Sequence, residues 1–239
     1  MANFVMLNQE KHANIKVIDE RSATYGDNVM YAMTFPFEFR NIQGSYPIFF
    51  QKNSETGAFF PVALFGFQEA ENLFLDDNGW NAAYIPLMIR RQPFVIGFQK
   101  NASDDDNKNA VITIDMDSPR VNTQTGHALF EQGGTSDYLR QMTASLEMIH
   151  AAHEHNDKFI KAITELELIE LFTLEIPLND GSKNQLLGLY TINEDKVQDL
   201  SGEQMHQLNS QGFLMPLYMV MASHSCIRTL IDKKNEQLG

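Results

Sequence analysis

Two adjacent arginines, Arg90 and Arg91, lie in an apolar stretch of the chain and are the residues best suited to chemistry. A guanidinium taken out of water needs a partner, because an unpaired buried charge is unstable. One interpretation is a clamp that binds a carboxylate or phosphate through paired hydrogen bonds. The other is a structural salt bridge to an acid such as Glu71, Asp76 or Asp77, and structural pairing is the commoner role of a buried arginine.

Aromatic and amide side chains from nearby segments complete the candidate ligand-binding set. Its other members are Tyr46, Asn72, Trp80 and Tyr84. Turn chemistry alone accounts for the DDNG segment at 76–79, and a single tryptophan is more often a core anchor than a ligand platform. The set predicts a pocket for a small anionic ligand, a peptide or a protein partner. It identifies neither a cofactor nor a catalytic residue.

Three histidines, His150, His153 and His155, are grouped within six residues of a helical segment. The first two are one turn apart, whereas His155 points elsewhere, and the zinc-peptidase spacing of two histidines four residues apart around a glutamate is absent. We expect no metal site here, and instead an exposed helix end whose negative pole favours histidine.

Two further groups have weaker signals. His224 and Cys226 resemble a base and a nucleophile, but residues two apart on a helix face different directions, so a buried structural cysteine is favoured. Asp115 and Asp117 share one side of an expected strand and, with Glu131, are candidate ligands for a hard cation, although no third ligand is certain. We therefore predict no metal centre.

The first half of the chain predicts β structure. Aromatic and β-branched runs at 46–51 and 59–67 flank a turn and indicate a hairpin. A short helix with Pro86 in its first turn precedes buried strands at 94–98 and 111–115. Between these strands the polar segment 101–109 predicts a surface loop.

The second half predicts helices and one more hairpin. Apolar residues from Leu139 to Ile163 recur at steps of three and four, which predicts a long helix or a helix pair over about 137–171, with a turn or bend at 153–156. Runs at 172–177 and 185–192 form the second hairpin. Ser201 and Gln204 predict a capping box for a helix that ends at Gly212, and Pro216 opens a final apolar helix.

These elements predict an α+β fold, with antiparallel hairpins or a mixed sheet in the N-terminal half packed with the long central helix and a C-terminal helix. We expect one domain over 1–239, or two tightly packed lobes, β-rich over about 1–136 and helix-rich over about 137–239.

Composition limits the function. The chain has 239 residues and a formal net charge of −13, which disfavours binding to nucleic acid. No signal peptide is recognisable, the apolar run at 214–222 is about half the roughly 20 residues that cross a bilayer, and there is one cysteine. We expect a soluble cytoplasmic protein without a membrane span. Twelve methionines and seventeen phenylalanines leave room for a homo-oligomeric interface.

An ordered series of motifs resembles the bacterial SapC family over most of the chain. The motifs are YPIFF at 46–50, PVALFGF at 61–67, ENLFL at 71–75, YIP at 84–86, RRQPF at 90–94, HALF at 127–130 and LLGLYTINEDK at 186–196. The resemblance implies a soluble protein of about this length and no established reaction. The family name refers to surface-layer loci, and some members are labelled peptide-transport permeases. In the family an aromatic residue commonly follows the second arginine, where this chain has Gln92.

Two functional hypotheses follow. The first, which we favour, is a non-enzymatic binding or accessory protein for a peptide, a carboxylate ligand or a protein partner, because no nucleophile and base are paired. The second is an enzyme acting on an anionic small molecule or peptide, with or without assistance from a metal, which predicts a bound metal or groups with perturbed pKa values converging in one cleft. A role in surface layers follows from the family name alone.

Overall fold

A computed structural model describes residues 2–101 and 104–238, and it describes no side chains for residues 100, 101 and 104–109. The fold is α+β, as predicted. The chain forms two compact units that are interleaved along the sequence. Unit 1 comprises Met1–Asp27 and Leu87–Ala151, and unit 2 comprises Asn28–Pro86 and Ala152–Gly239. The two lobes predicted on either side of residue 136 are each continuous in sequence, whereas each of these units combines two separate segments of the chain.

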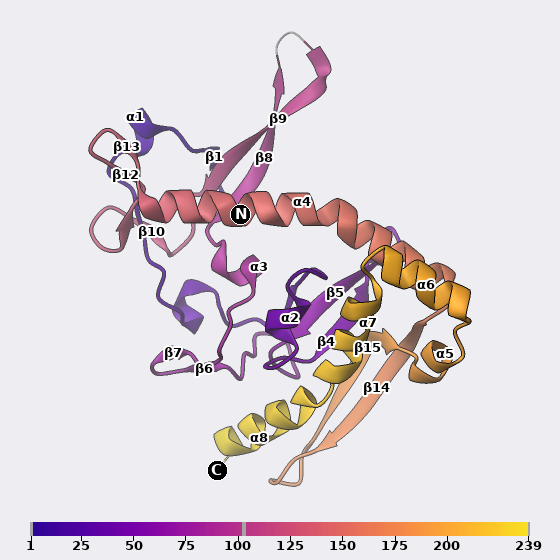
Figure 1. Ribbon diagram of the computed structural model, residues 1–239. Helices are drawn as coiled ribbons and strands as arrows, with labels where there is room; N and C mark the ends of the chain where they lie inside the picture. The colour runs from indigo at the N-terminus through magenta and orange to yellow at the C-terminus, as the bar shows by residue number, and fades with distance from the viewer. Residues whose placement is uncertain (1, 102–103, 239) are drawn as a thin grey trace. The chain divides into compact units, whose positions relative to one another are not determined.

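Unit 1 consists of short antiparallel sheets and the first part of a long helix (Figure 1). A three-stranded sheet has the order β1-β9-β8, a second has the order β10-β2-β11, and β12 pairs with β13. The elements are β1 (Phe4–Met6), α1 (Gln9–His12), β2 (Lys16–Val17), the 3-10 helix η1 (Ala23–Tyr25), α3 (Leu87–Arg90), β8 (Phe94–Asn101), β9 (Asp104–Asp115), β10 (Val121–Asn122), β11 (His127–Ala128), β12 (Phe130–Glu131), β13 (Gly134–Thr135) and the start of α4 (Asp137–Glu165).

The core of unit 1 explains why its sheets are stable. Phe94 and Ile114 are paired residues of β8 and β9, and they pack with Val17 and with Leu139 and Leu146 of α4. Burial of this apolar surface is the main stabilising contribution. The loop predicted at 101–109 is wrong for residue 101, which ends β8, and for residues 104–109, which begin β9 and pair with β8 across a register shift; residues 102–103 lie outside the described residues.

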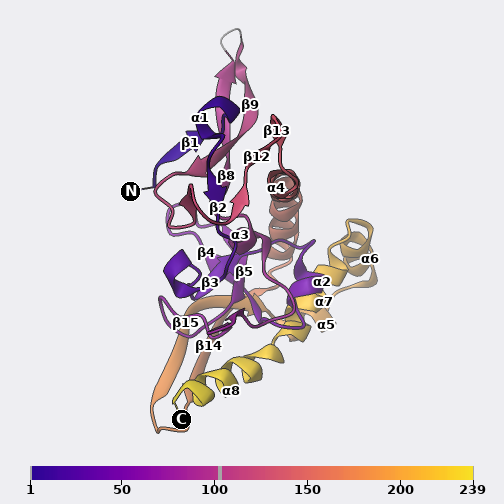
Figure 2. The same ribbon diagram turned by 90° about the vertical axis from the view of Figure 1, so that its left-hand side faces the viewer.

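Unit 2 is built on a five-stranded antiparallel sheet with the order β14-β15-β4-β5-β3. Its elements are β3 (Tyr31–Met33), α2 (Phe39–Ile42), β4 (Ile48–Lys52), β5 (Phe59–Leu64), β6 (Leu75–Asp76), β7 (Gly79–Trp80), the end of α4, β14 (Ile169–Pro177), β15 (Lys183–Ile192), α5 (Glu194–Gln198), α6 (Gly202–Ser210), α7 (Leu214–Ser223) and α8 (Cys226–Leu238). Both predicted hairpins are confirmed, because β4 pairs with β5 and β14 pairs with β15. The two views in Figures 1 and 2 show α8 beside the β14–β15 hairpin, where the Asn179 amide donates to Asn235 Oδ1 at 2.9 Å.

The turn predicted at 153–156 is wrong, because α4 is helical throughout its 29 residues. The two polar residues that suggested a break have places in the packing of unit 2. The ring of His153 meets Phe35 edge-on at 5.1 Å, and Asn156 is buried. The predicted capping box is confirmed at Ser201 and Gln204. The final helix, predicted as one, is two helices separated by a turn at 224–225.

One helical stretch of the described chain, Leu214–Leu238, is long and apolar enough to cross a membrane by length and composition. One third (33%) of its most apolar window is buried inside the structure, and core helices of soluble proteins pass the same test. Leu217 and Val220 of α7 and Leu230 of α8 are fully buried. The absence of a membrane span stays a prediction.

Candidate binding site

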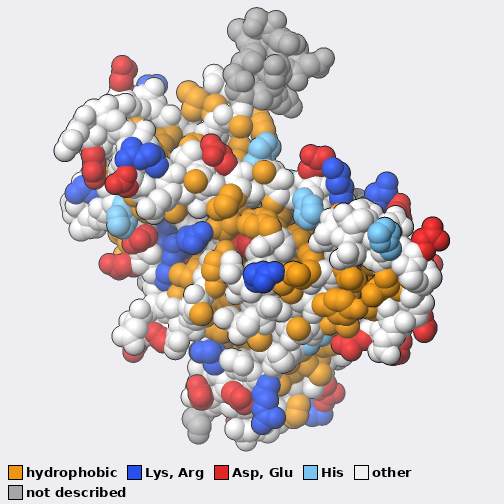
Figure 3. All heavy atoms as spheres, in the orientation of Figure 1, with side chains coloured by type: hydrophobic (Ala, Val, Ile, Leu, Met, Phe, Trp, Pro, Cys, Tyr) orange, Lys and Arg blue, Asp and Glu red, His pale blue; other side chains and the backbone are white. Residues whose placement is uncertain are grey.

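A groove in unit 2 lies over helices α2 and α7 and has a volume of about 400 Å³. Most of its lining is apolar, and in Figure 3 hydrophobic side chains gather where Figure 1 draws these helices. Phe37 and Met215 are respectively 43% and 55% exposed, which is high for large apolar side chains. The lining residues are Pro36, Phe37, Arg40, His155, Asn209, Gly212, Met215, Pro216 and Met219.

Arg40 makes the groove more than an apolar depression. Its Nη2 donates to the sulfur of Met215 at 3.0 Å, and a thioether is a weak acceptor. Among the described residues no carboxylate lies within ion-pairing distance of Arg40, and no acidic residue lines the groove. The chain has 31 Asp and Glu against 18 Lys and Arg, so this local absence of acid is unusual for it. An exposed guanidinium beside an apolar surface suits a ligand with both an apolar group and a carboxylate.

The walls of the groove are anchored to the sheet and to each other. The Ile48 amide of β4 donates to Ser223 Oγ of α7 at 2.8 Å, and Cys226 Sγ donates to the carbonyl of Gln43 just after α2 at 3.3 Å. The exposed ring of His155, which also lines the groove, contacts Phe213 at 5.2 Å. The contacts of Ser223 and Cys226 involve buried and backbone groups, and they hold α7 and α8 to the rest of unit 2.

Three of the predicted ligand-binding residues, Tyr46, Trp80 and Tyr84, form a hydrogen-bond network in unit 2. Trp80 Nε1 donates to the Tyr46 hydroxyl at 2.7 Å, and that hydroxyl donates to the Tyr84 carbonyl at 2.5 Å. The Tyr84 hydroxyl in turn donates to Glu38 Oε1 at 2.8 Å. Tyr46 is fully buried, and burial raises the pKa of its hydroxyl.

This network supports the groove rather than lining it. Glu38 precedes the first residue of α2, and it also accepts from Thr34 Oγ1 at 3.2 Å. The network therefore fixes the start of the helix that carries Arg40. Phe39 of the same helix packs on Phe159 of α4, which fixes the opposite side of α2.

Asn72, the fourth predicted residue of unit 2, lies in the turn before β6. Its side-chain oxygen accepts from the Phe74 amide at 3.0 Å, and the residue is buried. Glu71, one of the acids considered as an arginine partner, accepts from Lys234 Nζ and from the Phe67 amide, both at 2.7 Å. Asn72 stabilises the turn in the way that short polar side chains commonly do, and Glu71 also joins this segment to α8 through Lys234.

The two predicted arginines belong to unit 1, not to the unit that contains Tyr46 and Trp80. Arg91 Nη1 donates to the carbonyl of Phe94 at 2.7 Å, and burial lowers the pKa of the Arg91 guanidinium. The clamp predicted for Arg90 and Arg91 stays a prediction. None of the six predicted residues lines the groove over α2 and α7.

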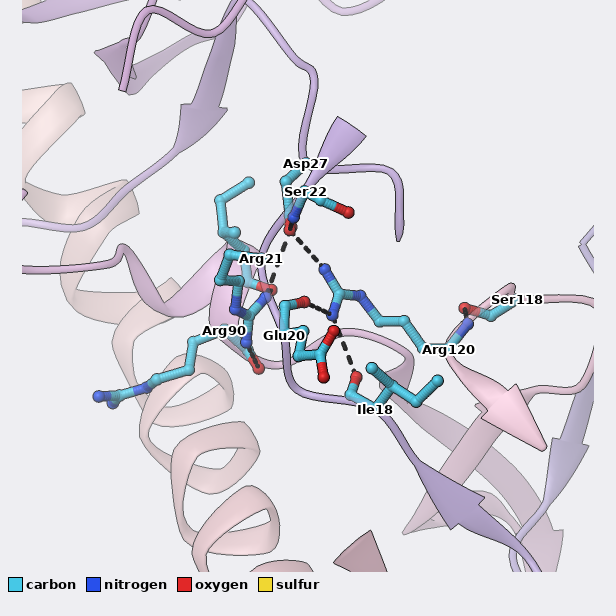
Figure 4. Close-up of polar contacts among 9 residues, drawn as sticks. Ile18, Glu20, Arg21, Ser22, Asp27, Arg90, Ser118 and Arg120 are labelled. Carbon is cyan, nitrogen blue, oxygen red and sulfur yellow. Dashed lines mark hydrogen bonds and ion pairs between the residues drawn. The ribbon is translucent and has the colours of Figure 1, made fainter. Parts of the chain in front are cut away.

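A buried ionic cluster that the sequence reasoning missed lies next to Arg90 in unit 1 (Figure 4). Arg120 Nη2 contacts Asp27 Oδ2 at 2.6 Å, and both side chains are fully buried. Arg21 Nη1 contacts Asp27 Oδ1 at 3.5 Å and donates to the carbonyl of Ile89 at 3.2 Å. Figure 4 shows Arg21 and Arg120 pointing towards Asp27, whereas the side chain of Arg90 extends away from them.

This cluster holds loops together. Arg120 also donates to the carbonyls of Ile18 and Glu20, at 3.1 and 2.7 Å, and its guanidinium lies over the ring of Tyr25. Burial, followed by the charge of Arg120, lowers the pKa of Arg21. The contacts join residues about 100 positions apart in the sequence, so the cluster ties the N-terminal segment to the rest of unit 1.

The histidines do not converge. His150 contacts Phe98 in unit 1, whereas His153 and His155 contact Phe35 and Phe213 in unit 2. All three lie inside α4 rather than at its end, so the predicted interaction with a helix terminus is wrong. Within residues 2–101 and 104–238, no group of three or more His, Cys, Asp or Glu side chains is arranged to hold a metal ion.

The remaining two candidate groups have structural contacts. The His224 ring stacks on Phe49 with centroids 5.0 Å apart, and its Nε2 lies 3.1 Å from Thr191 Oγ1. Cys226 is buried, as predicted, and burial raises the pKa of its thiol. Asp115 Oδ1 accepts from the amides of Asn3 and Asp117, which ends β9 and joins it to the segment before β1.

Comparison with known proteins gives a family but no activity. The family model described as SapC matches residues 7–230, which is nearly the whole chain. No curated protein and no solved structure matches the chain. The chain therefore belongs to the SapC family.

Proposed function

We propose that this SapC-family protein is a non-enzymatic binding or accessory protein, soluble in the cytoplasm, and that the groove over α2 and α7 binds an apolar peptide segment through a carboxylate. The observation that carries the proposal is Arg40, an exposed guanidinium whose described polar partner is the weak acceptor of Met215. A carboxylate would replace that contact with a charge-assisted hydrogen bond.

The rest of the lining suits the apolar part of such a ligand. Phe37, Met215 and Met219 offer aromatic and thioether surface, and methionine adapts to ligands of different shape. A volume of about 400 Å³ is at the small end of ligand pockets, which suits one or two side chains rather than a whole cofactor.

Binding is favoured over catalysis because the described buried groups with shifted pKa values are elsewhere. They are Arg21, Tyr46, Arg91, Tyr138, His224 and Cys226. None of them lines the groove. An enzyme would be expected to bring such groups together at its ligand site.

The test uses short peptides that place Leu or Phe beside Glu, each with a matched peptide in which Gln replaces Glu. Binding is followed by NMR of labelled methionine methyl groups, because Met215 and Met219 line the groove whereas Met148 is an exposed methionine of unit 1. We expect the Met215 and Met219 signals to move with the Glu peptides and the Met148 signal to stay.

The matched variants are Arg40→Ala and Arg228→Ala, since Arg228 is an exposed arginine of unit 2 outside the groove. Loss of a hydrogen bond to a charged group, about 1.5–3 kcal/mol, should weaken binding about 10- to 150-fold in Arg40→Ala only. Equal binding of the Glu and Gln peptides, or equal effects of the two variants, would show that Arg40 does not recognise a carboxylate.

A further inference from the structure

The outer edge of the five-stranded sheet in unit 2 is an open strand. β14 is the last strand in the order, and its described pairing is with β15 alone. No described hydrogen bond reaches the outer edge between Ile169 and Pro177 from another part of the chain. Nine residues of strand present about 30 Å of backbone donors and acceptors at that edge, and such an edge pairs readily with another strand.

β14 has few of the features that protect strand edges. It contains no lysine, and its proline is its last residue, where it does not interrupt the strand. Leu171 is 63% exposed, and Leu187 of the adjacent β15 is 60% exposed. An isolated exposed leucine is ordinary, but two of them beside an open edge form a surface that association would cover.

Both acidic side chains of β14 have a described partner within the chain. Lys183 of β15 pairs with Glu175, and the neutral amide of Asn193, the residue after β15, donates to Glu170 Oε2 at 2.5 Å. One of the two carboxylates is therefore charge-compensated by the hairpin itself.

We propose that the β14 edge pairs with the β14 edge of a second copy of this chain, antiparallel about a twofold axis at Thr173. Thr173 is the midpoint of Ile169–Pro177, so this register overlaps the whole strand. It places Thr173 opposite Thr173 of the other copy, and Phe172 opposite Leu174, and both kinds of cross-strand pair are favourable. Closed twofold pairing uses the same surface on both copies and leaves neither β14 edge open for further addition.

The positions of the two glutamates support a second copy as the partner. Side chains alternate between the two faces of a strand, so the odd-numbered residues of β14 lie on one face and the even-numbered residues on the other. A twofold axis perpendicular to the sheet keeps each face on the same side in both copies, so two directly opposite residues must both be odd-numbered or both be even-numbered. Glu170 and Glu175 therefore cannot face each other directly. In the proposed register Glu170 faces Ile176 and Glu175 faces Leu171, which avoids like charges in directly opposed positions.

Thr173 is an exposed residue of β14 and can be substituted without removing a buried side chain. The register passes from Phe172↔Leu189 to Leu174↔Leu186, so Thr173 lies opposite a bulge of two residues, Leu187 and Gly188, in β15. A cysteine at this position in each copy would lie next to its equivalent, with Cβ atoms close to disulfide range. The native chain has one cysteine, Cys226, which is buried and does not interfere.

The experiment compares Thr173→Cys and Leu187→Cys in the full chain under mild oxidation, on gels run without and with reductant. Both positions are exposed and lie on the same hairpin, so random collisions would affect both. We expect Thr173→Cys to form a reducible dimer, at a yield several-fold above that of Leu187→Cys. Equal yields, or no dimer from Thr173→Cys, would overturn the proposal.

Sedimentation equilibrium of the unmodified protein tests the same contact without a disulfide. We expect a reversible monomer–dimer equilibrium, and we expect Leu171→Glu to raise the dissociation constant at least about tenfold because it places a glutamate directly opposite Glu175 of the other copy. A monomer at every concentration, or a dimer that Leu171→Glu leaves unchanged, would contradict the proposal. This inference does not depend on the groove, because Arg40→Ala should leave the dimer intact.

Discussion

The buried pair of Asp27 and Arg120 gives the largest stability effect that we expect from one conservative substitution. Asp27→Asn keeps the size of the side chain but removes the charge that compensates Arg120. Breaking a buried ion pair by removing one partner typically costs about 3–5 kcal/mol. Arg120 retains its bonds to the carbonyls of Ile18 and Glu20, so we expect the lower end of this range, about 3 kcal/mol.

The effect is measured by urea unfolding of the full chain, followed by far-UV circular dichroism. A loss of about 3 kcal/mol, with a slope of about 1.5 kcal/mol per molar urea, lowers the midpoint by about 2 M. Trp80 is the single tryptophan and lies in unit 2, so its fluorescence follows the other unit in the same experiment.

The matched control is Asp137→Asn, which removes an aspartate from an exposed ion pair with Arg140 in the same unit. Exposed pairs contribute about 0–1 kcal/mol, so the control should change the midpoint little. If Asp27→Asn destabilised the protein no more than Asp137→Asn, the reasoning about the buried cluster would be refuted.

Two further outcomes follow from contacts in unit 2. Tyr46→Phe removes the acceptor of the Trp80 indole and should lower the free energy of unfolding by about 1–3 kcal/mol, with a shift in tryptophan emission; an unchanged spectrum and stability would contradict the network. Burial lowers the pKa of the His224 ring in the folded protein, so the unfolded chain, in which the pKa is about 6.5, binds a proton at this histidine more readily. The contribution of His224 to the free energy of unfolding is therefore present above about pH 6.5 and should be lost as the pH falls below that value. Unfolding measured at pH 7 and at pH 5 should therefore differ less in His224→Gln than in the unmodified protein, and an equal difference would exclude His224 as the cause.

Local patterns in the sequence predict many of the elements, because those elements depend on nearby residues. The hairpin at β4–β5 follows from aromatic runs and a turn, and the capping box at Ser201 follows from two residues three positions apart. The break predicted in α4 was wrong because tertiary contacts outweigh local pattern. Nothing near His153 in the sequence shows that Phe35 will pack against its ring.

The candidate site was harder to predict for the same reason. Arg40 stands alone in its segment, and its significance depends on Met215, which is 175 residues away in the sequence. The available signals were the unusual number of methionines in α7 and an arginine next to Phe37 and Phe39, and neither indicates a groove by itself. Tyr46 and Trp80 were recognised as a group, but their network with Glu38 required the fold to be known.

The interleaving of the two units affects how the chain folds during synthesis and which fragments of it can fold alone. Residues 28–86 of unit 2 are inserted within unit 1, so the first 27 residues leave the ribosome well before the strands and helix that complete their core. α4 begins in unit 1 and ends in unit 2, so a cut at the helix start, near residue 136, separates residues of both units. Neither half released by such a cut contains a complete core, and neither should fold alone. Fragments for expression should therefore follow the boundaries at 27/28, 86/87 and 151/152, with the two segments of a unit joined by a linker.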